Sequence, residues 1–354
     1  MLPAFLFGWV GGGILLSYVS DKVGRARVIG YALVGAVIGS ALSPLAQTAT
    51  SLSLVRVGTG ACVGAVMAVS ITFGAETLPN SRRPYLMGLL VNSYAFGIVL
   101  TGILQSRSIS FEVLSYSTLL FGVVALPFTI SNKWLVATGE KPNITGNGET
   151  NSVSARHVLL DHRGQVLIGS ALFGCMLIAL WATFSWVPTW ASERFISADG
   201  GAAIRGAAMM ALGIGGIVGS VISGVVTKLL GLTKGIVLCY VGAITLSFCL
   251  YGITSISQDF FLAGVFALTI FFGLSQGLMA TYIPSLFPRV IRATGVGLCF
   301  NIGRIVTALA MIQMGVIASA LGGYREALLI FSLVLVAGLI ATRRAPTPVN
   351  LETT

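Results

Sequence analysis

Charged residues are scarce in this sequence: Asp, Glu, Lys and Arg together make up only 9% of its 354 residues. A soluble globular domain carries about 25% charged residues, so an ordinary soluble fold is excluded. Apolar residues instead make up 55% of the chain, and the mean hydropathy is +0.93. We therefore predict an integral membrane protein.

Cysteine and histidine are also few, and their placement argues against several kinds of site. The cysteines stand singly within apolar runs, without Cys-x-x-Cys spacing: Cys62, Cys175, Cys239, Cys249 and Cys299. Both histidines, His157 and His162, fall in a polar segment. The apolar runs thus offer neither metal ligands nor a paired acid and base. We expect no metal, no cofactor and no enzymatic activity.

Long apolar runs, by contrast, fill most of the chain. A membrane-spanning helix needs roughly 20 apolar residues. Runs of this kind occupy residues 2–19, 28–47, 52–74, 86–106, 112–131, 164–190, 203–230, 235–255, 260–283, 293–319 and 324–342. They predict about eleven transmembrane helices. A transmembrane barrel is excluded because the runs are continuously apolar rather than alternating.

The net charge of +10 is distributed unevenly about these helices. If the turn at residues 21–27 faces the cytoplasm, helix alternation places fifteen Lys and Arg residues on the cytoplasmic side and five on the outer side. This asymmetry obeys the positive-inside rule and predicts a multi-pass protein of the cell (inner) membrane with a cytoplasmic C-terminus. The charge then reflects orientation and attraction to anionic membrane lipid, so we expect no nucleic-acid partner.

A polar stretch divides the chain into two parts. Residues 133–162 contain glycine, proline and a scatter of Thr, Asn and Ser, and they predict a cytoplasmic linker. Residues 1–132 would form an N-terminal helical bundle, residues 163–345 a six-helix C-terminal bundle, and residues 346–354 a cytoplasmic tail. The two parts look like diverged repeats, an organisation typical of transporters.

Five short motifs, in order along the chain, are similar to those of one transporter family. They are Asp21, Lys22, Gly24, Arg25 and Arg27; Arg56 to Gly64; Glu76, Pro79, Arg83 and Gly88; Ser131 to Leu135; and Phe287 to Gly297 followed by Gly303 and Arg304. Ser17 and Ala26 depart from the first motif. Together the motifs resemble the major facilitator superfamily, and in particular its metabolite and aromatic-acid proton symporters.

This resemblance implies an all-α membrane protein of the major facilitator type. We expect two helical bundles, of about five and six transmembrane helices, related by pseudo-symmetry. The matched motifs begin at the family's second helix, so we expect the family's first helix to be missing from this chain. In the aromatic-acid group that first helix carries aspartates implicated in proton coupling.

Arg304 is the clearest candidate for a binding residue. It lies about eleven residues into its apolar run, hence roughly 16 Å deep and close to the membrane midplane. A charge at that depth is costly and usually functional, and no Asp or Glu occupies the middle of a predicted helix. Its partner would be a carboxylate of the substrate, a charge on the missing helix, or polar groups of neighbouring helices.

Other polar and aromatic side chains within the runs are candidates to line a substrate site with Arg304. They are Asn92, Trp181, Gln276, Tyr282 and Asn301. Asn301 stands three residues before Arg304 and therefore shares its helix face. For each of the five, helix packing or anchoring at the membrane interface is the alternative role.

A second set of residues suggests a cytoplasmic gate. We expect Asp21 to cap the helix that begins near Ala293, and Arg25, Glu76 and Arg83 to complete a salt-bridge network there. The alternative is a solvated turn that only sets topology. Arg56 lies near the outer end of its run, where it would serve the outer vestibule and coupling or simply reach the interface.

Two glycine pairs have the spacing that allows close helix approach. Gly60 with Gly64, and Gly215 with Gly219, are each four residues apart within an apolar run. We expect both pairs to be helix-packing positions.

These observations favour a monomeric secondary active transporter of small organic anions. Its substrates would be carboxylates such as aromatic acids, moved by alternating access and coupled to protons. Two alternatives remain open. A sugar or polyol porter is favoured by Lys133-Trp134-Leu135, and a truncated, non-transporting relative by the missing helix.

Overall fold

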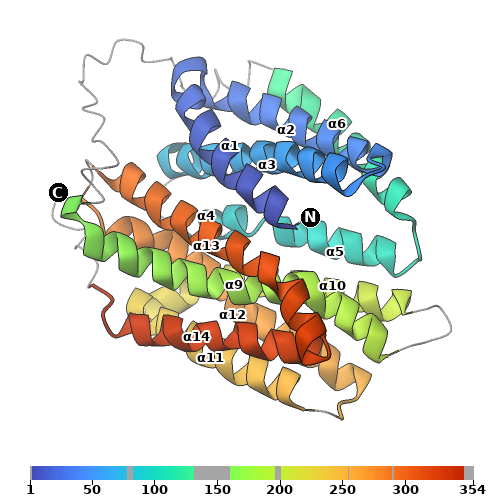
Figure 1. Ribbon diagram of the computed structural model, residues 1–354. Helices are drawn as coiled ribbons and strands as arrows, with labels where there is room; N and C mark the ends of the chain where they lie inside the picture. Colours follow the sequence, from blue (N-terminus) through green and yellow to red (C-terminus); the bar gives the residue numbers. More distant parts are fainter. Residues whose placement is uncertain are drawn as a thin grey trace. The chain divides into compact units, whose positions relative to one another are not determined.

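The computed structural model describes residues 2–77, 83–130, 160–195, 201–253, 255–288 and 291–346. Within these ranges all regular structure is helical. The α-helices are α1 (Leu2–Val23), α2 (Arg25–Leu42), α3 (Ala49–Thr77), α4 (Arg83–Val91), α5 (Tyr94–Gln105), α6 (Phe111–Ile130), α9 (Arg163–Arg194), α10 (Ala202–Leu230), α11 (Leu232–Gly252), α12 (Gln258–Ser285), α13 (Arg292–Leu321) and α14 (Tyr324–Thr342), and a short 3₁₀ helix, η1, covers Ser43–Leu45. Figure 1 shows their arrangement.

The helices confirm the membrane-spanning, all-α fold. In the described ranges nine helices are long and apolar enough to cross a bilayer. Large apolar side chains also remain on the outside, with Leu120 at 71% and Leu229 at 76% of full exposure. Such exposure would be unfavourable in water but is expected where lipid tails surround the helices.

Each predicted run corresponds to a helix, with one difference. The run at 86–106 is divided at Asn92 and Ser93 into α4 and α5. The turn tightens there, since the amides of Ser93, Ala95 and Phe96 bond to carbonyls three residues back instead of four. Asn and Ser are poor helix formers because their side chains compete for backbone hydrogen bonds, which favours an interruption at this point.

Contacts divide the chain into two compact units. Unit 1 comprises residues 1–79 and 110–154, and unit 2 comprises residues 80–109 and 155–354. The predicted bundles were drawn from the sequence repeat, whereas these units follow packing, and the segment 80–109 groups with the later helices. The bundle boundaries therefore stay a prediction.

Unit 1 is built around the crossing of α1 and α3. Gly60 and Gly64 of α3 face the backbone of α1, where an added Cβ would overlap the carbonyl oxygens of Phe5 and Trp9. Only glycine permits such close approach of two helix backbones. The predicted packing role of this glycine pair is confirmed.

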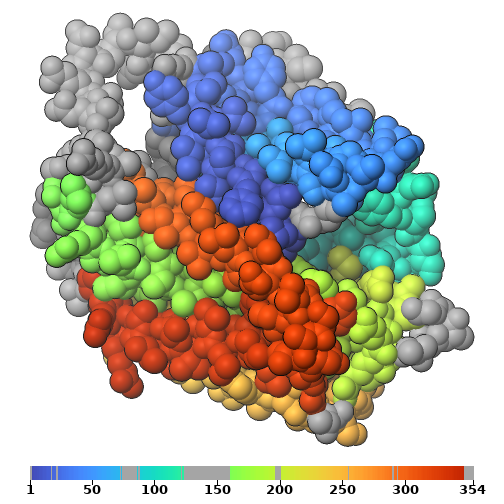
Figure 2. All heavy atoms as spheres, viewed as in Figure 1, coloured from blue at the N-terminus to red at the C-terminus, as the bar shows by residue number. Residues whose placement is uncertain are grey.

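Unit 2 is held together by a similar crossing of α10 and α12. A Cβ on Gly215 or Gly219 would overlap the carbonyl oxygen of Phe266 or Ile270 on α12. Around this pair α5 packs on α10, and α9 packs on both α13 and α14. Side chains of α13 and α14 cover much of the face of unit 2 that Figure 2 shows. The second predicted glycine pair is thus also a packing element.

Candidate functional site

Arg304 lies near the middle of α13, as its thirteenth residue of thirty. Its guanidinium carbon is 5.6 Å from the ring centroids of both Phe173, on α9, and Phe300, on α13 itself. The two rings meet edge to face, with centroids 4.6 Å apart. This arrangement favours a cation, since the electron-rich ring faces attract the guanidinium.

A glycine contact brings these three side chains together. A Cβ added to Gly174 of α9 would lie 3.3 Å from the Cα of Gly303 on α13. Phe173 and Arg304 are the neighbours of these glycines in sequence, so the close approach of the helices sets one side chain against the other. Phe300 precedes Arg304 by four residues and therefore lies one turn away on the same face.

A second aromatic cluster lies further along α9. The rings of Tyr94 and Trp181 are nearly parallel, with centroids 6.5 Å apart and an interplanar angle of 20°. The ring centroids of Phe184 and Tyr94 are 6.0 Å apart. Trp181 follows Phe173 by eight residues, which is about 12 Å along a helix. The aromatic cluster and the Arg304 site thus both lie along α9, at different positions on its axis.

The interruption between α4 and α5 places a buried amide beside α10. Asn92 is 2% exposed. Its Nδ2 donates a 2.6 Å hydrogen bond to the carbonyl oxygen of Gly216. Its Oδ1 is buried and has no hydrogen-bond partner among the described residues. The amide is therefore held at one end and unsatisfied at the other.

Gln276, on α12, lies near the same crossing. It is 5% exposed, and its Nε2 is buried without a hydrogen-bond partner in the described part of the chain. Gly88, one turn before Asn92, faces α12 at Gly277, the residue after Gln276. Asn92, directly after α4, and Gln276, on α12, thus both lie within about one helical turn of the contact between Gly88 and Gly277.

The remaining substrate-site candidates have other surroundings. Asn301 is half-buried on α13. Tyr282 lies near the C-terminal end of α12, where its hydroxyl donates a 2.9 Å hydrogen bond to the carbonyl oxygen of Pro346, after α14. The Tyr282 hydroxyl therefore already has a backbone partner, and its role in substrate binding stays a prediction.

The gate residues are described only in part. The side chains of Asp21, Glu76 and Arg83 lie outside the described residues, although their backbones belong to α1, α3 and α4. Arg25 is half-buried at the start of α2, directly after Gly24, whose φ of +103° favours glycine. Arg56 is half-buried in the second turn of α3. The gate and the outer-vestibule role stay predictions.

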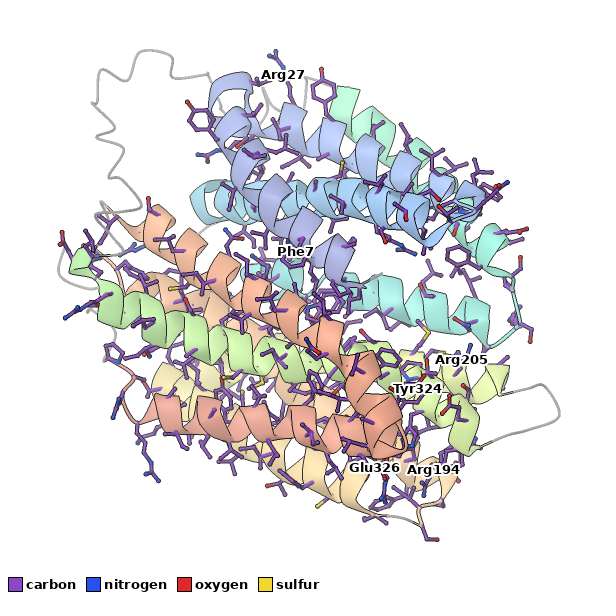
Figure 3. All side chains as sticks on the ribbon, viewed as in Figure 1. Phe7, Arg27, Arg194, Arg205, Tyr324 and Glu326 are labelled. Carbon is purple, nitrogen blue, oxygen red and sulfur yellow. The ribbon has the colours of Figure 1, made fainter. Side chains whose placement is uncertain are left out.

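Basic residues at one end of unit 2 have local partners. Figure 3 labels Arg194, Arg205, Tyr324 and Glu326 at this end. Arg205 donates to the Ser192 hydroxyl at 2.8 Å, and Arg194 lies over the rings of Trp190 and Phe195. Arg325 forms an ion pair with Glu326, the residue after it, at 2.8 Å. These contacts give each arginine a structural role.

Sequence reasoning did not identify the rings around Arg304. Phe300 could have been found from its spacing of four residues, because side chains so spaced on a helix are neighbours. Phe173 could not, since it is 131 positions from Arg304 and the contact depends on the packing of α9 against α13. The contact between Asn92 and Gly216 could not be predicted either, because it also depends on how separate helices pack.

Comparison with known proteins identifies the family. The family model described as Major Facilitator Superfamily matches residues 1–311. The chain belongs to this superfamily. The resemblance inferred from the five motifs is confirmed, and the protein is a multi-pass membrane transporter of the major facilitator type.

Individual members of the superfamily are similar to this chain at low identity. The inner membrane metabolite transport protein YgcS of Escherichia coli is 24% identical over 96% of this chain and 82% of its own length. The gallate transporter of Pseudomonas putida is 23% identical over 85% of this chain and 73% of its own length. The cis,cis-muconate transport protein of Acinetobacter baylyi is 22% identical over 90% of this chain and 78% of its own length.

Two solved superfamily structures share the fold. The transporter FucP in its outward conformation matches with a TM-score of 0.67 and 16% identity over 97% of this chain and 88% of its own. The proton:xylose symporter XylE matches with a TM-score of 0.70 and 17% identity, covering 97% and 85%. At such identities the likeness concerns the fold alone.

Proposed function

We propose that this member of the superfamily transports small organic anions, namely carboxylates that include aromatic acids, by alternating access coupled to protons. The observation that carries the proposal is Arg304, held against Phe173 and Phe300 in the middle of α13. A membrane protein places a cation at this depth only at substantial cost, which substrate binding would offset.

The chemistry of the site suits an aromatic carboxylate. The guanidinium carbon of Arg304 lies 5.6 Å from both ring centroids, and a guanidinium binds a carboxylate through two parallel hydrogen bonds. Phe173 and Phe300 add apolar surface beside the charge, against which a substrate ring would pack. The similarity to a gallate transporter and to a cis,cis-muconate transport protein supports a carboxylate substrate.

The orientation and the gate form part of the same proposal. Arg343 and Arg344 follow α14, and the excess of basic residues on their side supports a cytoplasmic C-terminus in the inner membrane. Asp21, Arg25, Glu76 and Arg83 would close that side during transport.

Uptake of labelled benzoate into cells or proteoliposomes tests the assignment of Arg304. We expect Arg304→Ala to abolish uptake and Arg304→Lys to retain a fraction, because lysine keeps the charge but loses the planar pair of donors. Arg194→Ala is the matched control, since Arg194 also lies over two aromatic rings but stands at the end of α9. Unchanged uptake in Arg304→Ala would refute the assignment.

Competition and pH experiments test the substrate class and the coupling. We expect unlabelled carboxylates, but not neutral sugars or polyols, to compete with labelled benzoate. Inhibition by neutral sugars together with indifference to carboxylates would select a sugar porter instead. An imposed proton gradient should drive accumulation in proteoliposomes, and a protonophore should abolish it.

A further inference from the structure

Two buried amides with unused hydrogen-bonding capacity lie where α4, α10 and α12 meet. Asn92 Oδ1 and Gln276 Nε2 are both buried, and neither has a hydrogen-bond partner among the described residues. Buried polar atoms without partners are rare in proteins because their desolvation is not compensated. Two of them near one helix crossing are therefore candidates to bind a ligand.

The orientation of the Asn92 amide is determined by its neighbour. Oxygen and nitrogen of a side-chain amide are assigned from the hydrogen bonds that they make. The carbonyl oxygen of Gly216 lies 2.6 Å from one amide atom and can only accept, so that atom must be Nδ2. Oδ1 is then fixed on the opposite side as an acceptor that awaits a donor.

Gln276 complements this acceptor. It makes no hydrogen bond with the described residues in the present orientation, and exchange of its amide oxygen and nitrogen would still leave one polar atom buried without a partner. Its amide is thus able to donate to a ligand oxygen or to accept from a ligand hydroxyl. Asn92 offers only an acceptor on its unsatisfied side.

Nearby hydroxyl groups do not satisfy either amide. Ser220 donates to the carbonyl oxygen of Gly273 at 3.2 Å, and Ser223 donates to the carbonyl oxygen of Ser220 at 2.6 Å. A hydroxyl group has only one proton to donate, so both are committed to the backbone. The donor for Asn92 Oδ1 must come from elsewhere.

We infer that Asn92 and Gln276 form a subsite for an uncharged hydroxyl group of the transported molecule. A hydroxyl is a single group able to donate to Asn92 Oδ1 while it accepts from Gln276 Nε2. This inference rests on the proposed function, in which Arg304 binds the carboxylate. It narrows the substrates to carboxylates that bear a hydroxyl group away from the acid.

The arrangement along α9 agrees with such a molecule. Phe173 marks the depth of Arg304, and Trp181, about 12 Å further along the helix by its rise, contacts Tyr94. Tyr94 stands two residues after Asn92. The interval along α9 between the ring beside Arg304 and the Trp181–Tyr94 pair is comparable to the length of a single-ring acid that has a polar group and a hydrogen bond at each end.

Binding to the purified full chain tests the subsite. The probes are benzoate and its 3-hydroxy and 4-hydroxy derivatives, with affinity measured by quenching of tryptophan fluorescence or by calorimetry. We expect at least one hydroxy derivative to bind about tenfold more tightly than benzoate, because the unsatisfied amides penalise a ligand without the hydroxyl. Asn92→Leu and Gln276→Met should each remove this preference for the hydroxy derivatives over benzoate.

A matched control separates the subsite from a general effect of buried polar groups. Ser247 is fully buried on α11, and its hydroxyl likewise has no partner among the described residues. Ser247→Ala should therefore leave the preference for the hydroxy derivatives intact. Thermal unfolding of each variant confirms that the protein is folded, and Gln276→Met serves if Asn92→Leu does not fold.

The outcomes distinguish this inference from the proposed function. Equal binding of benzoate and both hydroxy derivatives overturns the subsite, in which case water satisfies the amides, but leaves the carboxylate proposal standing. A preference that survives in Asn92→Leu and Gln276→Met also overturns it. Absence of binding by all three carboxylates overturns the proposed function, and this inference with it.

Discussion

Asn92 and Gly216 are 124 positions apart in the chain, and the Asn92 amide donates a hydrogen bond of 2.6 Å to the Gly216 carbonyl oxygen. This contact ties the interruption between α4 and α5 to the middle of α10. It also fixes which amide atom of Asn92 remains unsatisfied. A single interhelical hydrogen bond thus links the fold of unit 2 to its candidate subsite.

Loss of this hydrogen bond should destabilise the protein. Interhelical hydrogen bonds in membrane proteins contribute about 0.6 kcal/mol on average and up to about 1.7 kcal/mol. We expect Asn92→Ala to lie at the upper end of this range, because it also leaves the Gly216 carbonyl without its donor. Thermal unfolding in detergent measures the change. Thr101→Ala, which removes a bond within α5 only, should have a smaller effect, and equal effects would contradict this account.

The α10–α12 crossing should not tolerate a side chain at Gly219. A Cβ there would overlap the carbonyl oxygen of Ile270 and lie 2.7 Å from the amide of Leu274, so the two helices would have to separate. We expect Gly219→Ala to cost about 1–3 kcal/mol in the free energy of unfolding, as overpacking usually does. Gly315→Ala on α13, where an added Cβ meets nothing within 4 Å, is the control. A well-folded, equally stable Gly219→Ala protein would show that the crossing is looser than described.

The rings beside Arg304 should contribute to anion affinity. Phe300→Leu keeps the apolar volume but removes one of the two ring faces that hold the guanidinium. A cation–π contact is worth about 1–2 kcal/mol when desolvated, so benzoate affinity should fall roughly 5- to 30-fold. Calorimetric titration measures the loss. Phe271→Leu, at a phenylalanine that contacts Gly242 instead, should leave the affinity unchanged. Equal losses in the two variants would contradict a specific role for Phe300.

Tyr282 should secure the segment that follows α14. Tyr282→Phe removes the hydrogen bond to the Pro346 carbonyl and costs about 1 kcal/mol at this contact. We expect faster amide hydrogen exchange in the peptide that begins at Arg343, with unchanged benzoate affinity. Tyr251→Phe, which removes a buried hydroxyl bonded to Thr183, should not change exchange in that peptide. A loss of affinity in Tyr282→Phe would instead support the substrate-binding role expected from the sequence.

The membrane fold and the family could both be predicted from the sequence alone. Apolar runs of spanning length determine helices wherever lipid surrounds the chain, because the backbone must satisfy its own hydrogen bonds there. Close glycine pairs and the depth of Arg304 could also be read from spacing, since helical periodicity converts sequence positions into faces and depths.

Only the tertiary structure decided which side chains meet. The position of the Phe173 ring beside Arg304 and the hydrogen bond from Asn92 to Gly216 depend on how separate helices cross. Residues distant in the chain are brought together by glycine contacts between helix backbones, and the sequence pattern of one helix contains no information on its partner's register. The interruption at Asn92 and Ser93 is favoured by these two residue types, and the hydrogen bond that Asn92 donates to α10 holds it in place.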